Sequence, residues 1–316
     1  MARTDPSIRP AWPALPSLLL LLACSGSGSD SPDPSQPVAS STAMTSDEAS
    51  TVTAALLDTC QVKGSTTDLP QALVPAGDEG VLALSAGYSA ACVSVVPQVN
   101  GSTVTTTYTF SNCTTTAGGG TVAGSIVTTH TVGGSSYSIS YGNLRVTRGT
   151  ETFTINGTQT AVLDKIAKTS TLAMPSPGMT IAYSKSGSAY NGTYTLTGTF
   201  SGDYATAQTF KLSGSGTLGK PGGGSEGITI ESSDPVTWRE ASGCCYPLGG
   251  TIKLYETVAL SGGGQSSSAT RQVAAYAFTS TCGTVSYTAY TYQLTRSGTV
   301  NQVVVGPTSL VLPACP

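Results

Sequence analysis

Apolar and polar residues alternate along most of the chain after about residue 81. In the segment YTLTGTF at 194–200, Tyr194, Leu196 and Phe200 fall on one side, and the threonines fall on the other. A period of two is typical of a strand with one buried face. Similar patterns occur at 104–110, 137–141, 153–155, 210–218, 252–260, 276–278, 285–294 and 300–305. Together these patterns predict roughly a dozen short strands, rich in the Thr, Tyr and Val that suit a half-exposed sheet.

Turn residues separate these predicted strands at short intervals. Asn-Gly pairs at 100–101, 156–157 and 191–192 suit two-residue hairpin turns, and the glycine clusters at 118–120, 222–224 and 262–264 suit loop tips. Consecutive strands joined by tight turns predict an antiparallel meander. We therefore expect an all-β domain that forms an extended curved sheet, a half-barrel or a loose sandwich, three alternatives that the pattern leaves open.

One short helix is predicted ahead of the strands. Ser46 can cap it, and the acidic Asp47 and Glu48 favour the positive end of a helix. Val52, Ala55, Leu56 and Thr59 then fall on one stripe, and Gly64 can end the helix. This helix would lead a single β-rich domain over residues 47–316.

The first residues have the features of an export signal. Arg3 and Arg9 precede a short apolar run at 18–22, which ends in Leu-Ala-Cys at 22–24. A basic start, a short apolar core and small residues at the cleavage site are typical of a signal peptide, here over residues 1–23. The apolar run is too short to span a bilayer as a helix.

The sequence Leu-Leu-Ala-Cys at 21–24 resembles the lipobox of bacterial lipoproteins. This resemblance implies cleavage before Cys24, diacylation of its thiol and acylation of the new amine with fatty acids such as palmitate. Several acyl chains on one residue anchor a protein stably in a membrane. In this family Ser25, in place of Asp, implies sorting to the outer membrane. The Ser-, Gly-, Pro- and Asp-rich stretch at 24–46 then predicts a disordered tether.

Charged residues make up only 10% of the chain, and the formal net charge is −3. Ordinary soluble domains carry about a quarter charged residues. Phosphate binding needs clustered Lys and Arg, which this chain lacks, so nucleic acid is excluded as a partner.

Seven cysteines remain besides Cys24, and an export signal would place them where disulfides persist. Cys92 and Cys113 flank the predicted hairpin at 100–101 and could bridge it. Adjacent cysteines seldom bond to each other, so Cys244 and Cys245 each need another partner. The nearest partners in sequence are Cys282 and Cys315. Seven is an odd number, and we expect Cys60, near the end of the predicted helix, to be the free thiol.

The segments CYPLGG at 245–250 and FTSTCG at 278–283 predict a strand pair tied at its ends. They are similar to C-terminal segments of uncharacterised β-rich bacterial lipoproteins. That resemblance implies no activity.

Candidate catalytic groups are few. The single histidine, His130, lies in a threonine-rich strand, where we expect it to face solvent. Ser225 formally matches a G-x-S-x-G motif, but we expect it in a glycine loop, without the strand-turn-helix context and without a later histidine. Four acids, Glu226, Glu231, Asp234 and Glu240, could supply a glycosidase pair, although we expect them on a surface loop or edge strand.

No cofactor or metal is expected from this sequence. One histidine and oxidised cysteines make a zinc site improbable. The acidic pair Asp78-Glu79, followed by Gly80, lacks the alternating ligands of an EF-hand and suits an exposed turn.

Tyrosines gather in two groups that could form a binding face or fill the core. We expect mainly the core, because few other large apolar residues are available. The tyrosines are Tyr183, Tyr190, Tyr194, Tyr204, Tyr276, Tyr287, Tyr290 and Tyr292.

These observations predict a non-enzymatic lipoprotein of the outer membrane. Acyl chains on Cys24 would hold it in the membrane, and the β domain would bind or scaffold an envelope protein or glycan. A first alternative is a carrier that holds an apolar ligand in a curved sheet. A second alternative is a carbohydrate-active enzyme that uses the acids of 226–240.

Overall fold

The computed structural model describes residues 33–43, 92–114, 120–164, 166–203, 209–239, 244 and 246–312. All regular structure in these ranges is β, which confirms the predicted all-β fold. The helix predicted at 46–64, Cys24 and the tether up to Pro32 lie outside the described residues. The described strands form one 15-stranded antiparallel sheet.

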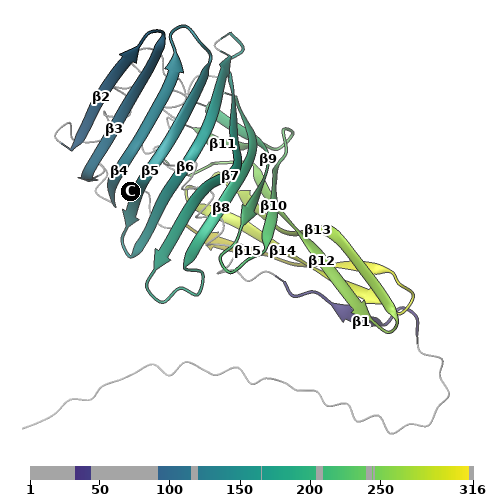
Figure 1. Ribbon diagram of the computed structural model, residues 1–316. Coiled ribbons are helices and arrows are strands. Elements are labelled where there is room, and N and C mark those ends of the chain that lie inside the picture. Colours follow the sequence, from purple (N-terminus) through teal and green to yellow (C-terminus); the bar gives the residue numbers. More distant parts are fainter. Residues whose placement is uncertain are drawn as a thin grey trace, which may run out of the picture. The chain divides into compact units, whose positions relative to one another are not determined.

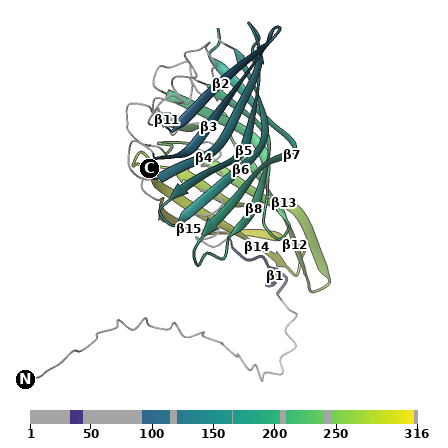
Figure 2. The same cartoon turned by 60° about the vertical axis from the view of Figure 1, so that its left-hand side comes forward.

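Most strands pair with their sequence neighbours, as the predicted meander requires (Figures 1 and 2). The order across the sheet is β1-β14-β13-β12-β10-β9-β8-β7-β6-β5-β4-β3-β2, with β11 pairing with β9 and β15 with β14. The bounds are β1 Pro37–Ser40, β2 Val93–Asn100, β3 Thr103–Thr114, β4 Gly120–Thr131, β5 Ser136–Arg148, β6 Glu151–Asp164, β7 Thr169–Lys185, β8 Gly192–Asp203, β9 Thr209–Gly219, β10 Ser225–Ile230, β11 Val236–Arg239, β12 Thr251–Gly262, β13 Gln265–Phe278, β14 Thr284–Thr295 and β15 Val300–Val311.

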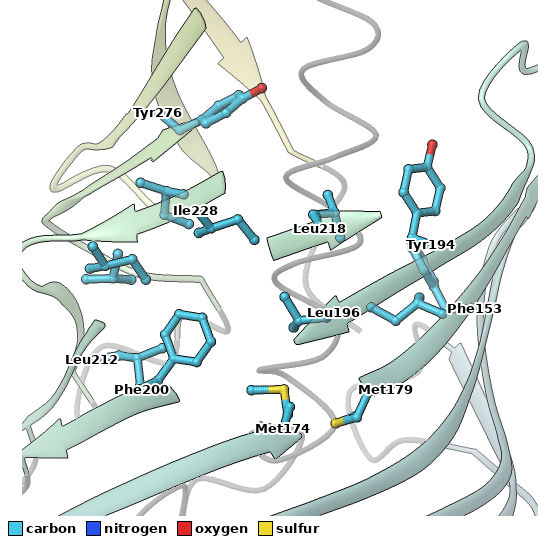
Figure 3. Packing of buried hydrophobic residues seen from close by; sticks show 14 of the residues in the cluster. Phe153, Met174, Met179, Tyr194, Leu196, Phe200, Leu212, Leu218, Ile228 and Tyr276 are labelled. Carbon is cyan, nitrogen blue, oxygen red and sulfur yellow. The ribbon is translucent and has the colours of Figure 1, made fainter. Parts of the chain in front are cut away.

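One face of this sheet carries the core. Alternation along each strand places apolar side chains on that face, where they form one buried cluster. Figure 3 shows part of the cluster, with side chains from β6–β10 and β13 directed towards the same interior. Members with almost no exposed surface are Leu144, Phe153, Ile155, Met179, Ile181, Leu218, Leu254, Tyr276 and Leu294.

β-bulges interrupt the register between many neighbouring strands. Between β6 and β7 the register shifts between Asn156 and Thr160, and between β7 and β8 it shifts between Met174 and Met179. Gly157 has a φ of +117° and packs closely against Gly178, whose carbonyl oxygen lies 2.9 Å from the place of a Cβ. Glycine fits such a bulge because it tolerates positive φ and a close backbone approach.

The turn predictions are confirmed in part. Asn100 pairs with Thr103 across a two-residue turn, and the turns at 222–224 and 263–264 also form. The prediction for Asn156-Gly157 is wrong, because this pair lies inside β6 at a bulge rather than in a hairpin turn. The two-residue turn predicted at Asn191-Gly192 is also wrong, because the loop from β7 to β8 spans residues 186–191 and Gly192 begins β8.

The end of the segment predicted as a tether takes part in the sheet. Its residues 37–40 form β1, which pairs antiparallel with β14. Val38 and Ala39 also pack against the buried cluster.

Candidate functional site

A charged cluster interrupts the apolar face where β9, β10 and β12 meet. In β10, alternation directs Glu226 to the same face as Ile228 and Ile230, and Glu226 is 0% exposed. Gly227 pairs with Tyr255 of β12, so Glu226 lies beside Glu256. Two carboxylates facing each other across neighbouring strands repel unless a cation or a proton stands between them.

Lys220 supplies that cation from the turn between β9 and β10. Its Nζ donates hydrogen bonds to Glu226 Oε1, at 2.9 Å, and to Glu256 Oε1. The turn is closed by a bond from the Lys220 N–H to the Gly224 carbonyl, which returns the chain so that Glu226 lies beside Lys220. The side chain of Lys220 is 21% exposed and that of Glu256 is 32% exposed, so the cluster reaches the surface only through these two residues.

Burial governs the ionisation of this cluster. Loss of hydration raises the pKa of Glu226 to about 7, although its hydrogen bond to Lys220 works in the opposite direction. Burial alone would lower the pKa of Lys220, but hydrogen bonds to Glu256 and Glu226 raise it above its usual value. Glu226 Oε2 is buried and has no hydrogen-bond partner in the described part of the chain. The cluster can therefore take up or release one proton near neutral pH.

A second cation lies close by on the same face. Arg271 of β13 pairs in register with Glu256, and its guanidinium carbon lies 5.2 Å from the centre of the Tyr292 ring. Its Nη2 donates to Ser267 Oγ at 3.2 Å. With Arg271 included, this part of the face holds two cationic and two acidic side chains, so their formal charges balance when all are ionised.

We expect the buried carboxyl of Glu226 to make stability depend on pH. The folded protein holds this proton up to about pH 7, whereas the unfolded chain releases it near the ordinary value of 4.5. The free energy of unfolding should therefore fall as pH rises from 4.5 to 7, and should then change no further on account of this group. Each unit of pKa difference is worth about 1.4 kcal/mol, so the fall should not exceed about 3.5 kcal/mol.

Thermal or urea unfolding between pH 4.5 and 8 measures this fall. The variant Glu226→Gln keeps the shape of the side chain but lacks the titrating group, and its unfolding free energy should lose most of that pH dependence. The same slope in wild type and variant would show that Glu226 does not titrate in this window.

Among the described acids considered in sequence, Glu226 is set apart from Glu231 and Asp234. Glu226 is buried on the apolar face, which corrects the expected surface position; alternation in β10 aligns it with two isoleucines. Glu231 instead bonds to Lys253 Nζ at 2.6 Å, with 44% of its side chain exposed. Asp234 lies in the turn before β11, and its N–H bonds to the Glu231 carbonyl. Glu240 lies outside the described residues.

Ser225 and His130 also differ from expectation. Ser225 is the first residue of β10 rather than part of the glycine loop. His130 is half-buried and packs on Tyr137 of the neighbouring strand, with ring centres 5.0 Å apart. The prediction that it faces solvent is wrong, because register places it opposite the buried Tyr137.

Two disulfides join cysteines that the sequence had marked as candidates. Cys92–Cys113 ties β2 to β3 across the hairpin, which confirms that pairing, with Cα atoms 5.3 Å apart. Cys244 bonds to Cys282, one of its two proposed partners, with Cα atoms 5.7 Å apart. Cys60, Cys245 and Cys315 lie outside the described residues, as does the turn proposed at 78–80.

The strand pair predicted at 245–250 and 278–283 is only partly correct. The Phe278 N–H bonds to the Gly250 carbonyl, so the segments are adjacent, and the disulfide joins them. Residues 246–250 form no strand, however, and Leu248 instead donates its N–H to the Thr237 carbonyl of β11.

Most of the tyrosines belong to the core, as expected. Tyr190 and Tyr290 are half-buried, and Tyr204 lies outside the described residues. The buried members of the two groups are Tyr183, Tyr194, Tyr276, Tyr287 and Tyr292.

Sequence reasoning missed Lys220 and Glu256. The signal for Glu256 was present, because it occupies an apolar position of the alternating segment 252–260, between Leu254 and Val258. An acid at such a position requires a cation or a proton beside it. Lys220 carried no comparable signal, since a lysine before a glycine-rich turn is ordinary.

A surface depression of about 630 Å³ lies at the β4–β5 and β6–β7 turns. Among the described residues that line it, Asp164 is the one that carries a charge. The Oδ1 of Asp164 accepts the N–H groups of Ile166 and Ala167, so this carboxylate stabilises a turn.

Comparisons with protein-family models, curated proteins and solved structures found no match to this chain. The described part of the chain contains no helix long and apolar enough to cross a membrane. Within the same ranges, no three His, Cys, Asp or Glu side chains are grouped so that they could hold a metal ion.

Proposed function

We propose that this chain is a bacterial outer-membrane lipoprotein, anchored through acyl chains on Cys24, whose β domain binds or scaffolds without catalysis. The lipobox-like sequence at 21–24 and the polar tether behind it support the anchor. The two disulfides support export, because such bonds persist in oxidising compartments. The partner would be an envelope protein or a glycan.

One observation carries the non-catalytic part of this proposal: two of the acids considered for hydrolysis, Glu226 and Glu231, bond to lysines. Lys220 binds both Glu226 and Glu256, and Lys253 binds Glu231. A glycosidase needs an acid and a second carboxylate separated by room for the sugar and a water molecule. Here an ammonium group lies between the buried carboxylate of Glu226 and the partly exposed carboxylate of Glu256 instead.

Removal of the anchoring thiol tests the first part. The Cys24→Ala variant should move from the membrane fraction to the soluble fraction, because the acyl chains that hold the mature protein can no longer be attached. Fractionation with carbonate washing measures this shift, and Cys60→Ala serves as the control that should stay in the membrane. Recovery of Cys24→Ala in washed outer membranes would refute the anchor.

A second candidate function is supported by the apolar face. Strands β3 to β14 line it with Leu, Ile, Val and Tyr, the side chains expected of a carrier for a lipid or acyl chain. Native mass spectrometry of the purified protein, followed by solvent extraction, distinguishes the two functions. A stoichiometric bound lipid would favour the carrier, whereas protein without a bound lipid would favour the binding or scaffolding module.

A further inference from the structure

The last strand of the sheet, β15, has an unpaired side within the described residues. It pairs with β14 from Val300, opposite Leu294, to Val311, opposite Thr284. A strand in an antiparallel pair uses only part of its N–H and C=O groups for that partner, so β15 carries a row of groups that points away from β14. Such a row can accept a further strand.

The side chains of β15 differ from those of an ordinary solvated edge. Val303, Val304 and Val305 are 36%, 59% and 47% exposed. Adjacent valines point to opposite faces, so apolar surface is exposed on both sides of the strand. The strand also contains no charged residue. Edges are usually protected against pairing by lysines, by prolines or by short length.

Proline does not protect this part of β15. Tyr287 pairs with Thr308 and Ala289 pairs with Val305, so Gly306 and Pro307 form a bulge opposite one residue. The six residues Val300–Val305 therefore stay uninterrupted. The opposite edge of the sheet is different, because Pro97 lies in the middle of β2 with no bulge beside it. A proline there removes an N–H donor from a strand that would otherwise be available.

We propose that the Val300–Val305 edge pairs antiparallel with the same edge of a second copy of this chain. Two identical strands related by a two-fold axis give a closed, self-complementary contact. The chain carries a formal charge of −3, so two copies repel each other overall. This edge contains no charged residue, so two copies can meet along it without bringing charged side chains together. The pairing would satisfy the outward backbone groups and cover the exposed valines. The proposal goes beyond the proposed function and does not depend on the lipid anchor.

Photo-cross-linking of the full-length chain in detergent tests this contact. A benzophenone amino acid placed at Val304 should give a product of two chains, with the cross-link mapped by mass spectrometry to residues 300–305 of the second copy. The same amino acid at Thr257, an exposed position on the interior strand β12, should give none. A cross-link from Val304 to β2 of another copy, or no two-chain product, would overturn the proposal.

A charge at the contact provides a second, independent test. Val304→Lys would place one ammonium group of each copy inside the paired stretch, and the dimer dissociation constant in sedimentation should rise at least tenfold. Ser309→Lys is the matched control, because Ser309 is exposed on the same strand beyond the bulge, and its dissociation constant should be unchanged. A wild-type protein that stays monomeric at high micromolar concentration would also overturn the proposal, whatever the variants do.

Discussion

Lys220→Met should destabilise the folded protein by about 3–5 kcal/mol at pH 8, since removing one partner of a buried ion pair leaves an uncompensated charge. Lys220 is the cation that bonds to both Glu226 and Glu256. Without it, two carboxylates would face each other across β10 and β12, one of them with no exposure to water. Urea unfolding at pH 8 measures the loss.

The pH dependence separates this explanation from a simple loss of packing. At pH 5 Glu226 holds its proton in the folded protein, because its pKa is raised to about 7. The destabilisation should therefore be smaller at pH 5 than at pH 8. The double variant Lys220→Met, Glu226→Gln should also regain part of the stability at pH 8.

Lys253→Met is the matched control for this experiment. Lys253 bonds to Glu231 at a more exposed site, where both side chains keep contact with water. Such surface pairs contribute at most about 1 kcal/mol. Equal effects of the two lysine substitutions would contradict a special role for the buried cluster.

Gly216→Ala should destabilise the protein by about 3 kcal/mol, at the upper end of what overpacking a core costs. Gly216 of β9 pairs with Gly198 of β8, and the ring of Phe200 lies over this place. A Cβ at Gly216 would clash with the carbonyl oxygen of Thr197 and would lie 3.2 Å from Phe200 Cζ. Because the first of these atoms belongs to the backbone, two strands would have to move apart.

The control for Gly216 is another glycine with open surroundings. A Cβ at Gly249 would meet no heavy atom within 4 Å, so Gly249→Ala should change the free energy of unfolding by no more than about 0.5 kcal/mol. Chemical unfolding with both variants measures the difference. If Gly216→Ala were as stable as wild type, the close approach of β8 and β9 would not exist in solution.

Two of the strands that the sequence failed to predict, β2 and β7, contain prolines, which usually end a strand. β7 runs from Thr169 to Lys185 through Pro175 and Pro177, and its register with β8 shifts at this place. β2 continues through Pro97, which lies in an edge strand. Bulges and edges tolerate proline because no ladder hydrogen bond is required of it there. Whether a residue lies at such a place depends on its neighbours in the sheet, which a local pattern does not contain.

For the candidate site, too, one part could be predicted from the sequence and another part depended on the tertiary structure. Alternation along 252–260 was enough to place Glu256 on the apolar side of its strand. Its contact with Lys220, 36 residues earlier, depends on how β9, β10 and β12 lie against one another. For that reason the sequence suggested four neighbouring acids as a group, whereas the structure separates Glu226 from Glu231 and joins Glu226 to a lysine and a distant glutamate.

By itself the sequence determined the properties that depend on residues close together in the chain. A period of two predicted most of the strands and their buried faces, and the short hairpin at 100–101 allowed Cys92 and Cys113 to be matched. The tertiary structure alone decided which strands lie at an edge and which charges are buried. These depend on contacts between residues far apart in the chain. The uncharged edge of β15 and the lysine between two glutamates result from strand order and register, because only the assembled sheet determines which groups have a partner and which have none.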